Sequence, residues 1–212
     1  MTIRMKPLNV AEICPATRAL GPGLRSVLWV QGCPIGCKGC IAQDWIPMVP
    51  ASLWSPSQAA DQLLSNPEVE GVTISGGEPM VQAEGLAALI RILRSRKNLH
   101  IICFTGFVYE GLILKPLFPG VQNLLDLLDV LIDGPYLEKQ NSGDTFAGSR
   151  NQRILKLSDR PAPAGNEWTP RKTELHIRNG NILAVGVPPR NLEKDWITRT
   201  IDPSFERLKE VE

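Results

Sequence analysis

Short apolar runs alternate with helical patterns along the first three quarters of the chain. Five runs have the length and composition of buried strands: 26–30, 72–74, 100–104, 129–132 and 153–157. Between them, apolar residues recur at helical spacing, most clearly at Leu86, Leu89, Ile90 and Leu93. Repeated strand–helix–strand units predict right-handed crossovers and a parallel sheet, either doubly wound or curled toward a barrel. Both arrangements place ligands beyond the carboxyl ends of the strands.

Local signals mark the helices of this alternation. Ser55, Pro56 and Gln58 have the residue types and spacing of an N-cap, a first helical position and a capping box. Two shorter helices are expected, one from about residue 109 and one near 123–128. The arginines of the helix around Leu89 are expected to face solvent: Arg91, Arg94 and Arg96.

The chain changes character after residue 158. A stretch rich in Pro, Ala and Gly is typical of a linker, and beyond it Asn179-Gly180 separates two alternating apolar runs. An Asn-Gly pair in that setting is a strong hairpin signal. We therefore expect a domain over 1–158 and an extension over 159–212, made of a linker, a β-hairpin and a charged tail.

Composition and charge exclude several classes of protein. The chain has 23 Lys and Arg against 22 Asp and Glu, a net charge of +1, so no long-range field favours nucleic acid or an acidic membrane. The amino terminus lacks the apolar region of a signal peptide, and no apolar run is long enough to span a membrane. We therefore expect a cytoplasmic protein without nucleic-acid or membrane partners. Thiols stay reduced in that compartment, which favours a metal or catalytic site over disulfides.

Three of the five cysteines lie close together in the sequence. Cys33, Cys37 and Cys40 form a C-x3-C-x2-C pattern directly after the first predicted strand, at the ligand-binding end. Neither the paired knuckles of zinc sites nor the spacing of bacterial ferredoxins matches it. Three thiolates fit three irons of a [4Fe-4S] cube and leave the fourth iron open to a small molecule. Two alternatives remain: the thiols are buried like small apolar residues, or they bind zinc together with Cys14.

The other cysteines and the histidines carry weaker signals. Cys103 lies inside an apolar run and is expected in the core. Cys14 precedes Pro15 in a segment that we expect to be irregular, and we predict that it is not a ligand. His100 and His176 fall in predicted strands without partners, so we assign neither a role.

The cysteine pattern and a second motif together resemble the radical S-adenosylmethionine (SAM) superfamily. The second motif, Gly76-Gly77-Glu78-Pro79, follows the second predicted strand as the cysteines follow the first. Within the superfamily, the chain is similar to the activating proteins of anaerobic ribonucleotide reductase and other glycyl radical enzymes. Further stretches share this similarity: Gly21-Pro22-Gly23-Leu24-Arg25, Cys37-Lys38-Gly39-Cys40 with Trp45, Thr105-Gly106, Asp133-Gly134-Pro135-Tyr136 and Gly148-Ser149-Arg150-Asn151-Gln152.

This resemblance implies a fold, two cofactors and a set of binding residues. The implied fold is an α/β partial TIM-like barrel of the radical SAM type, here with a small C-terminal β-hairpin extension. Cys33, Cys37 and Cys40 would hold a [4Fe-4S] cluster whose open iron is chelated by SAM. One electron then cleaves SAM to methionine and a 5′-deoxyadenosyl radical, which abstracts a hydrogen atom. The implied SAM-binding residues are Gly39, Ile41, Gly76, Gly77, Glu78, Pro79, Thr105, Asp133, Ser149 and Asn151.

The chemistry of these residues agrees with the implied contacts. Gly76 and Gly77 permit a close backbone approach to the methionine part of SAM. Pro79 favours extended torsions at Glu78, so backbone carbonyls of this turn can meet the SAM ammonium group. Asp133 ends an apolar strand at the same edge, where the resemblance implies a contact with SAM, directly or through a cation.

Several of these residues also have a purely structural interpretation. Asp133 and Thr105 have the residue types of turns and caps, and either could serve only there. Ser149, Asn151 and Gln152 offer a short polar cluster for the ribose of SAM or for substrate, or else form a surface loop.

Three hypotheses describe the function. The leading one is an activase that installs a glycyl radical on a partner such as anaerobic ribonucleotide reductase, with electrons from a flavodoxin- or ferredoxin-type donor. The second is a radical SAM enzyme that modifies a peptide or small molecule, with the C-terminal hairpin as a recognition element. The third is a non-catalytic iron–sulfur electron-transfer protein, which would not cleave SAM.

Overall fold

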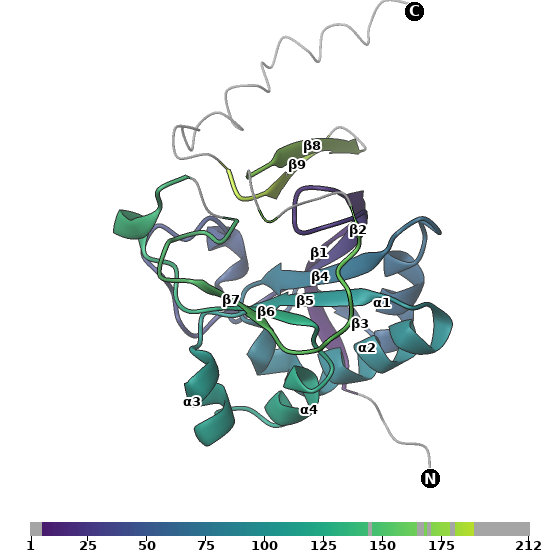
Figure 1. The fold of residues 1–212 in the computed structure, drawn as a ribbon, viewed down its shortest axis with the longest axis horizontal. Helices are drawn as coiled ribbons and strands as arrows, with labels where there is room; N and C mark the ends of the chain where they lie inside the picture. Colours follow the sequence, from purple (N-terminus) through teal and green to yellow (C-terminus); the bar gives the residue numbers. More distant parts are fainter. Residues whose placement is uncertain (1–5, 144–145, 165–167, 169–170, 179–180, 189–212) are drawn as a thin grey trace, which may run out of the picture.

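The computed structural model describes residues 6–143, 146–164, 168, 171–178 and 181–188 (Figure 1). One sheet has the strand order β3-β1-β2-β4-β5-β6-β7. Its strands are β1 (Leu8–Thr17), β2 (Arg25–Val30), β3 (Ser52–Trp54), β4 (Gly71–Gly76), β5 (His100–Phe104), β6 (Val130–Asp133) and β7 (Arg153–Lys156). A second sheet pairs β8 (Thr173–Arg178) with β9 (Asn181–Gly186), which confirms the predicted hairpin strands. The predicted Asn179-Gly180 turn and the charged tail lie outside the described residues.

The helices follow the predicted alternation. The α-helices are α1 (Pro56–Leu63), α2 (Ala83–Arg96), α3 (Tyr109–Leu114) and α4 (Val121–Leu125), and the short 3-10 helices are η1 (Gln43–Trp45), η2 (Pro79–Gln82) and η3 (Glu138–Gln140). Both halves of the predicted capping box form at the start of α1, between Ser55 and Gln58. Among the described residues, no helix has the length and apolar character of a membrane span.

Strands β2, β4, β5 and β6 run parallel and form the centre of the sheet. Their register places Leu28 beside Ile74, Ile74 beside Cys103, and Cys103 beside Leu131. Helices in the connections return the chain to the same end before each strand, as parallel pairing requires. The structure therefore confirms the predicted α/β class with a largely parallel sheet.

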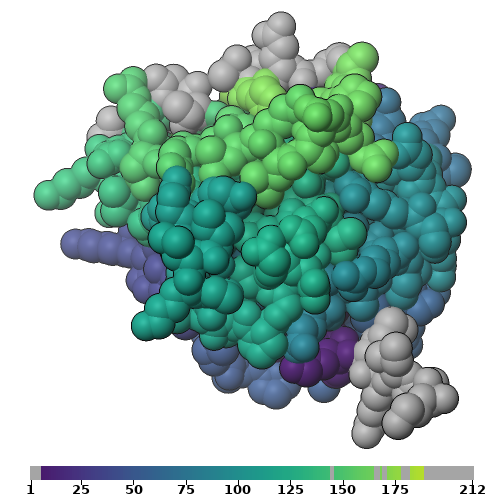
Figure 2. Space-filling model, turned by 60° about the horizontal axis from the view of Figure 1, so that its bottom comes forward, coloured from purple at the N-terminus to yellow at the C-terminus, as the bar shows by residue number. Residues whose placement is uncertain are grey.

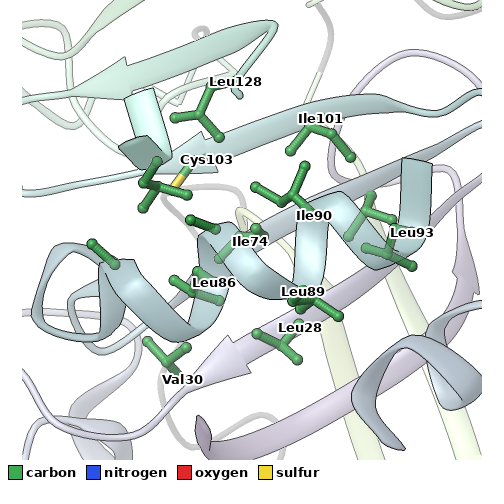
Figure 3. Close-up of a cluster of buried hydrophobic side chains, with 14 of the residues drawn as sticks. Leu28, Val30, Ile74, Leu86, Leu89, Ile90, Leu93, Ile101, Cys103 and Leu128 are labelled. Atoms are coloured by element: carbon green, nitrogen blue, oxygen red, sulfur yellow. The ribbon is translucent and has the colours of Figure 1, made fainter. Parts of the chain in front are cut away.

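Helices α1, α2 and α4 cover one face of this sheet (Figure 1). Figure 3 shows Leu86, Leu89 and Ile90 of α2 directed at the side chains of the strands. These three leucine and isoleucine side chains have no solvent exposure, and neither has Cys103. The prediction that Cys103 is a core residue is confirmed.

The other face of the sheet is covered mainly by residues that follow β7. Val185 and Val187 at the end of the hairpin pack in one cluster with Cys14 of β1 and with Val27 and Trp29 of β2. The side chains of β2 alternate between the faces, so Val27 and Trp29 point away from the helices. This face is therefore covered by the C-terminal hairpin and not by helices.

A neighbouring cluster continues this cover toward β6. Phe146 and the strand residues Ile102 and Ile132 form its buried part, and Trp168 packs against it. The Phe146 ring lies 5.3 Å from the Trp168 ring and 6.0 Å from the Phe104 ring, measured between centroids. Phe104 also packs against the hairpin cluster, so the two clusters adjoin on one face.

Strand β1 corrects the prediction that Cys14 lies in an irregular segment. The strand is antiparallel to β2, but its register shifts between Val10 and Glu12 and again between Cys14 and Thr17. Each shift breaks the alternation of buried and exposed residues, so no period of two marks the strand in the sequence. The prediction that His176 lacks partners is also wrong, because its ring nitrogens lie 3.8 and 3.9 Å from the Cys14 sulfur.

The strand–helix alternation predicted a parallel sheet, but the sheet is not parallel throughout. Strand β7 is antiparallel to β6, and β1 and β3 are antiparallel additions at the other side. The only helix between β6 and β7 among the described residues is the short η3. Asn151 donates to the Pro135 carbonyl at 2.7 Å and Gln152 to the Gly134 carbonyl at 2.9 Å. These bonds bring the chain back at the end where β6 finishes, which forces an antiparallel return.

A buried polar network at the amino ends of the strands corrects two further predictions. Arg25 donates to the carbonyls of Val72 and His100 at 2.8 and 2.7 Å, and its guanidinium lies 3.5 Å from the His100 ring. His100 therefore has a partner, and burial, with the nearby Arg25 charge, lowers its pKa to about 4. Arg94 does not face solvent freely, because it donates to the buried Asp129 at 2.8 Å.

Candidate functional site

The motifs predicted from the sequence meet at one edge of the sheet. Cys33 follows β2, Gly77 follows β4, Thr105 follows β5 and Asp133 ends β6. Because these four strands are parallel neighbours, their carboxyl ends lie side by side. The structure thus confirms that the motifs share one edge, and the contacts between them define the site.

The cysteine loop is closed by a backbone hydrogen bond between its two ends. The Gly32 N–H donates to the Trp45 carbonyl at 2.9 Å. Within the loop, Gly36 and Gly39 have φ angles of +62° and +73°, which glycine adopts without strain. The chain therefore leaves β2, turns tightly around the cysteines and returns beside its starting point.

The thiols of Cys33, Cys37 and Cys40 are free and partly exposed. Their exposure contradicts the alternative in which they are buried like small apolar residues. Burial raises the pKa of the Cys40 thiol, a backbone hydrogen bond at Ala42 lowers it, and the Cys37 and Cys33 thiols raise it. Among the described residues, no three His, Cys, Asp or Glu side chains converge where a single metal ion could sit.

Gly76 and Gly77 are required by the protein's own backbone. A Cβ at Gly76, where φ is +111°, would lie 2.4 Å from the Val30 nitrogen, and one at Gly77 would lie 2.3 Å from the Gly32 carbonyl oxygen. The Gly77 N–H uses this close approach to donate to the Val30 carbonyl at 2.7 Å. The two glycines therefore hold the turn after β4 against the start of the cysteine loop.

Glu78 joins the turn after β4 to the turn after β5. Its backbone is extended, with φ −122° and ψ 108°, as predicted from Pro79. The buried carboxylate accepts hydrogen bonds from the Met80 N–H at 2.9 Å, the Thr105 hydroxyl at 2.8 Å and the Gly106 N–H at 2.8 Å. Burial raises the pKa of Glu78 to about 7, although the three hydrogen bonds lower it. Both carboxylate oxygens of Glu78 thus already accept hydrogen bonds from the protein.

Two side chains fill the space beside glycines of the site. A Cβ at Gly106 would lie 2.5 Å from Cδ1 of Ile35, so this residue of the cysteine loop covers the turn after β5. A Cβ at Gly39 would lie 2.8 Å from the carboxyl carbon of Glu138. The Glu138 carboxylate of η3 therefore occupies the place where any other residue at position 39 would project. Ile41, just beyond the last cysteine, is 52% exposed.

The buried Asp133 carboxylate forms an ion pair with the exposed Arg153 that the sequence did not reveal. Its two oxygens accept from Nε and a terminal nitrogen of Arg153, at 2.9 and 2.5 Å. One of them also accepts from the Tyr109 N–H at 2.8 Å. Arg153 continues to Glu110 with bonds of 2.9 and 2.7 Å and lowers the pKa of that carboxyl to about 2. The network fixes the end of β6 to the start of α3 and to β7.

Ser149 lies in the interior, so the surface-loop alternative is wrong for this residue, whereas Asn151 and Gln152 are only partly buried. Ser149 is fully buried, and its hydroxyl donates to the Asn151 side chain at 2.7 Å. Asn151 and Gln152 in turn donate to the carbonyls of Pro135 and Gly134. These three polar side chains hold the turn after β6 in place.

Comparison with known proteins decides which family these motifs belong to. Residues 19–155 match the 4Fe-4S single cluster domain. This chain belongs to that family. The matched segment of this iron–sulfur protein contains the three cysteines and every predicted SAM-binding residue. It ends at residue 155, before the C-terminal extension begins.

Several relatives of this iron–sulfur protein are activating proteins. The anaerobic ribonucleoside-triphosphate reductase-activating protein of phage T4 is 29% identical over 157 residues, 72% of this chain and 96% of the relative. That of Vibrio cholerae is 31% identical over 168 residues, 71% of this chain and 99% of the relative. The pyruvate formate-lyase-activating enzyme of Staphylococcus epidermidis is 31% identical over 155 residues, 68% of this chain and 60% of the relative. The predicted resemblance to the radical SAM activases, with a [4Fe-4S] cluster and SAM as cofactors, is confirmed.

Among solved structures, QueE from Escherichia coli matches 60% of this chain and 70% of its own, with a TM-score of 0.38 and 15% sequence identity. The phage and Vibrio relatives align along nearly their whole length, yet over a quarter of this chain has no counterpart in either. This iron–sulfur protein therefore adds a substantial segment to the domain that it shares with them.

The donor set fits an iron–sulfur cluster better than a zinc ion. Each thiolate of a cluster ligates its own iron, so the three sulfurs need not converge on one point. Cys14 lies too far away to complete a zinc site, because its register partner Val27 is about 10 Å below the end of β2. Its thiol is also buried beneath the C-terminal hairpin.

Sequence reasoning found the cysteines and the turns of this site but missed Arg153 and Glu138. Arg153 reaches Asp133 from a strand 20 positions later, and Glu138 reaches Gly39 from a separate short helix. Neither residue belongs to a local motif. No signal in a single sequence marks either contact, because each depends on the packing of two loops.

Proposed function

We propose that this protein is a radical SAM activase that places a glycyl radical on a partner enzyme such as anaerobic ribonucleotide reductase. One observation supports this most directly: three free, partly exposed cysteines lie beside the Gly76–Pro79 turn, in a domain whose relatives are named as activating proteins. The proposal includes a flavodoxin- or ferredoxin-type electron donor. It also includes a cytoplasmic location, where thiols stay reduced.

In this proposal, the cysteine loop and the Gly76–Pro79 turn act directly on the cofactors. Cys33, Cys37 and Cys40 would hold the cluster within the tight loop that also contains Gly39 and Ile41. When bound, the cluster and SAM would supply the radical chemistry that removes a hydrogen atom from the substrate. The turn offers backbone carbonyls to the SAM ammonium group, since the Glu78 side chain is committed elsewhere.

The polar residues of the neighbouring turns act as positioning residues. Thr105 donates to Glu78, and both oxygens of Asp133 already accept hydrogen bonds. Ser149 and Asn151 are bonded to each other, and Asn151 donates to the turn after β6. Each of these side chains therefore contributes to SAM binding mainly by holding the backbone of its turn in place. A direct contact with SAM would have to form beside the hydrogen bonds that the side chain already makes.

The same reasoning extends to the architecture. We propose that β2, β4, β5 and β6 are the core of a radical SAM partial barrel, with the cofactors at its carboxyl edge. The division into a catalytic domain over 1–158 and an extension over 159–212 belongs to this proposal. Its support is the end of the family match at residue 155.

A second candidate function is the modification of a peptide or small molecule by the same chemistry. One observation favours it: the C-terminal hairpin packs against Trp29, at the end of the strand that leads into the cysteine loop. An added element at that place would alter which substrate reaches the site.

Anaerobic reconstitution tests the chemistry shared by both candidates. The protein is loaded with iron and sulfide, reduced with dithionite and assayed for 5′-deoxyadenosine from SAM. Cys37→Ala should abolish the cluster spectrum and the product, whereas Cys14→Ala should retain both. A fully reconstituted protein that forms no 5′-deoxyadenosine contradicts the proposed function.

Glycyl radical formation separates the two candidates. Anaerobic ribonucleotide reductase is added to the reduced, SAM-loaded protein, and its glycyl radical is sought by electron paramagnetic resonance. A doublet that depends on Cys37 supports the activase. Cleavage of SAM without any such radical favours the second candidate.

A further inference from the structure

The C-terminal extension, meaning the described residues of 159–188, is attached along the second sheet face together with Ser158, the residue before it. At the amino ends of the strands, the Ser158 hydroxyl donates to Asp129 at 2.5 Å. Nearby, Pro163 fills the space over Gly23, where a Cβ would lie 2.5 Å from it. Figure 2 shows this part of the extension, in light green, lying against the teal surface of the central elements.

Polar anchors then hold the extension to the loop before β7. Arg171 donates to the carbonyls of Ala147 and Gly148 at 2.7 and 2.9 Å and to the Asn141 side chain at 2.8 Å. Trp168 packs edge-on against Phe146 of the same loop. The extension is thereby fixed over β5 and β6.

A third set of contacts holds the hairpin over β1 and β2. Glu174 accepts from the Thr17 hydroxyl at 2.6 Å and from the Arg18 N–H at 2.9 Å. Val185 is fully buried against Cys14 and Trp29. The hairpin therefore presents one face to the sheet and the opposite face, with Ile177 at 75% exposure, to solvent.

These contacts reach the cysteine loop itself. Trp29 lies 5.4 Å from Trp45, measured between ring centroids, and Trp45 accepts the hydrogen bond that closes the loop. Trp45 and Leu183 of β9 both pack against the cluster that contains Trp29. The hairpin thus borders the cysteine loop from the side of the sheet that the helices leave uncovered.

We infer that the C-terminal extension is a fixed wall of the reaction chamber that closes the second face of the sheet to substrate. Substrate then reaches the cysteine loop only past the carboxyl ends of β2, β4, β5 and β6. The match to the family ends at residue 155, so the wall lies outside the part of the chain that the family defines. The inference rests on the proposed function for what the chamber contains, but the wall itself can be tested without any cofactor.

Two buried cysteines report on the two faces separately. Cys14 lies under the hairpin and Cys103 under the helices, both with no solvent exposure. The full-length apo protein is treated with iodoacetamide under native conditions, and labelling of each cysteine is followed by peptide mass spectrometry. Val185→Asp places a charge beneath the hairpin, and Ile177→Asp places the same charge on its exposed face.

In Val185→Asp, iodoacetamide should label Cys14 at least tenfold faster than in the wild type, while Cys103 stays protected. Ile177→Asp should change neither labelling rate. Equal acceleration at both cysteines means that the variant unfolds as a whole, and Arg171→Ala then replaces it. If Arg171→Ala also leaves Cys14 protected, or exposes both cysteines together, the wall is not a separate element and the inference fails.

Access to the cluster is measured next on the reconstituted full-length protein. A small iron chelator is added, and loss of cluster absorbance is followed in wild type, Val185→Asp and Ile177→Asp. Bleaching should be several-fold faster in Val185→Asp alone. If Cys14 is released but bleaching is unchanged, the extension does not guard the chamber. A protein that binds no cluster contradicts the proposed function instead and leaves the labelling result standing.

Discussion

The two faces of the central sheet bury similar cysteines in different ways. Cys103 lies under α2, whose residues come between β4 and β5 in the chain. Cys14 lies under a hairpin whose His176 is 162 positions away. Both thiols have no solvent exposure, yet the cover of Cys103 is local and that of Cys14 is distant. The comparison shows that the two faces of one sheet can be covered differently. One is covered by a helix whose periodic pattern is local in the sequence, and the other by a segment that comes much later in the chain.

This difference has energetic consequences. The helix face is one continuous apolar core that includes β2, β4, β5 and α2. The other face is held by two smaller clusters and by polar anchors such as Arg171 and Glu174. Disruption of the helix face should therefore unfold the molecule, whereas disruption of the second face should release the extension alone.

The largest expected effect comes from the helix face. Leu89→Ala leaves a cavity where a fully buried side chain contacts the strands, and such changes cost about 2–5 kcal/mol. Denaturant titration should show this loss, and Cys14 and Cys103 should become labelled together. Leu114→Ala, at a position 82% exposed, is the matched control. Release of only one cysteine in Leu89→Ala would mean that the two faces are not coupled as described.

A second effect concerns the carboxyl edge that both faces share. The pKa of Glu78 is raised from 4.5 to about 7, so the folded protein disfavours the charged form. The contribution of Glu78 to stability is then greatest below pH 4.5 and falls as the pH rises toward 7, by about 3 kcal/mol in all.

Comparison with Glu78→Gln isolates that contribution, because glutamine does not titrate. The difference in unfolding free energy between wild type and Glu78→Gln should decrease from pH 4.5 to pH 7 and then level off. Denaturant curves at several pH values measure it. A difference that stays constant with pH shows that Glu78 does not titrate in this range.

Releasing the extension from the second face should require less free energy than unfolding the helix face. Arg171→Ala removes charged hydrogen bonds to the Ala147 and Gly148 carbonyls, each worth about 1.5–3 kcal/mol at most. Because these bonds hold only the extension, Cys14 labelling should accelerate while the main unfolding transition moves little. Lys115→Ala, which removes a charge from an exposed position, should leave both measurements unchanged. A large shift of the main transition would place the extension inside the cooperative core.

The smallest effect is expected at the margin of the helix face. Ser55→Ala removes the N-cap hydrogen bond to Gln58 at the start of α1, which costs about 1 kcal/mol. Thermal unfolding should begin a few degrees lower, and neither buried cysteine should be released under native conditions. If Cys14 is released, α1 and the hairpin face are more closely coupled than their separate clusters indicate.

Much of the fold was predictable because it follows local rules. The parallel strands, α2 with its apolar stripe and the capping box of α1 all appear where the pattern placed them. Strand β1 was not predictable, because two register shifts break its alternation. The antiparallel β7 was missed for another reason: its direction depends on hydrogen bonds from Asn151 and Gln152 to a distant turn.

The candidate site divides in the same way. The sequence alone located the cysteine loop and the Gly76–Pro79 turn, since both are contiguous motifs at strand ends. It did not show why the glycines are needed, because the atoms that a Cβ would strike belong to Val30 and Gly32. It also left Asp133 without its partner Arg153, which only β7 supplies.

By itself, the sequence determined the α/β class, the position of the cysteine loop and the edge at which the motifs meet, because periodicity and spacing are properties of neighbouring residues. Only the tertiary structure decided what covers the second face, which side chains hold the turns and how Cys14 differs from Cys103. Those outcomes depend on contacts between residues such as Glu174 and Thr17, 157 positions apart. Such contacts form because the apolar surface that the helices leave uncovered must be buried. The local sequence of the segment that buries it does not indicate where that segment packs.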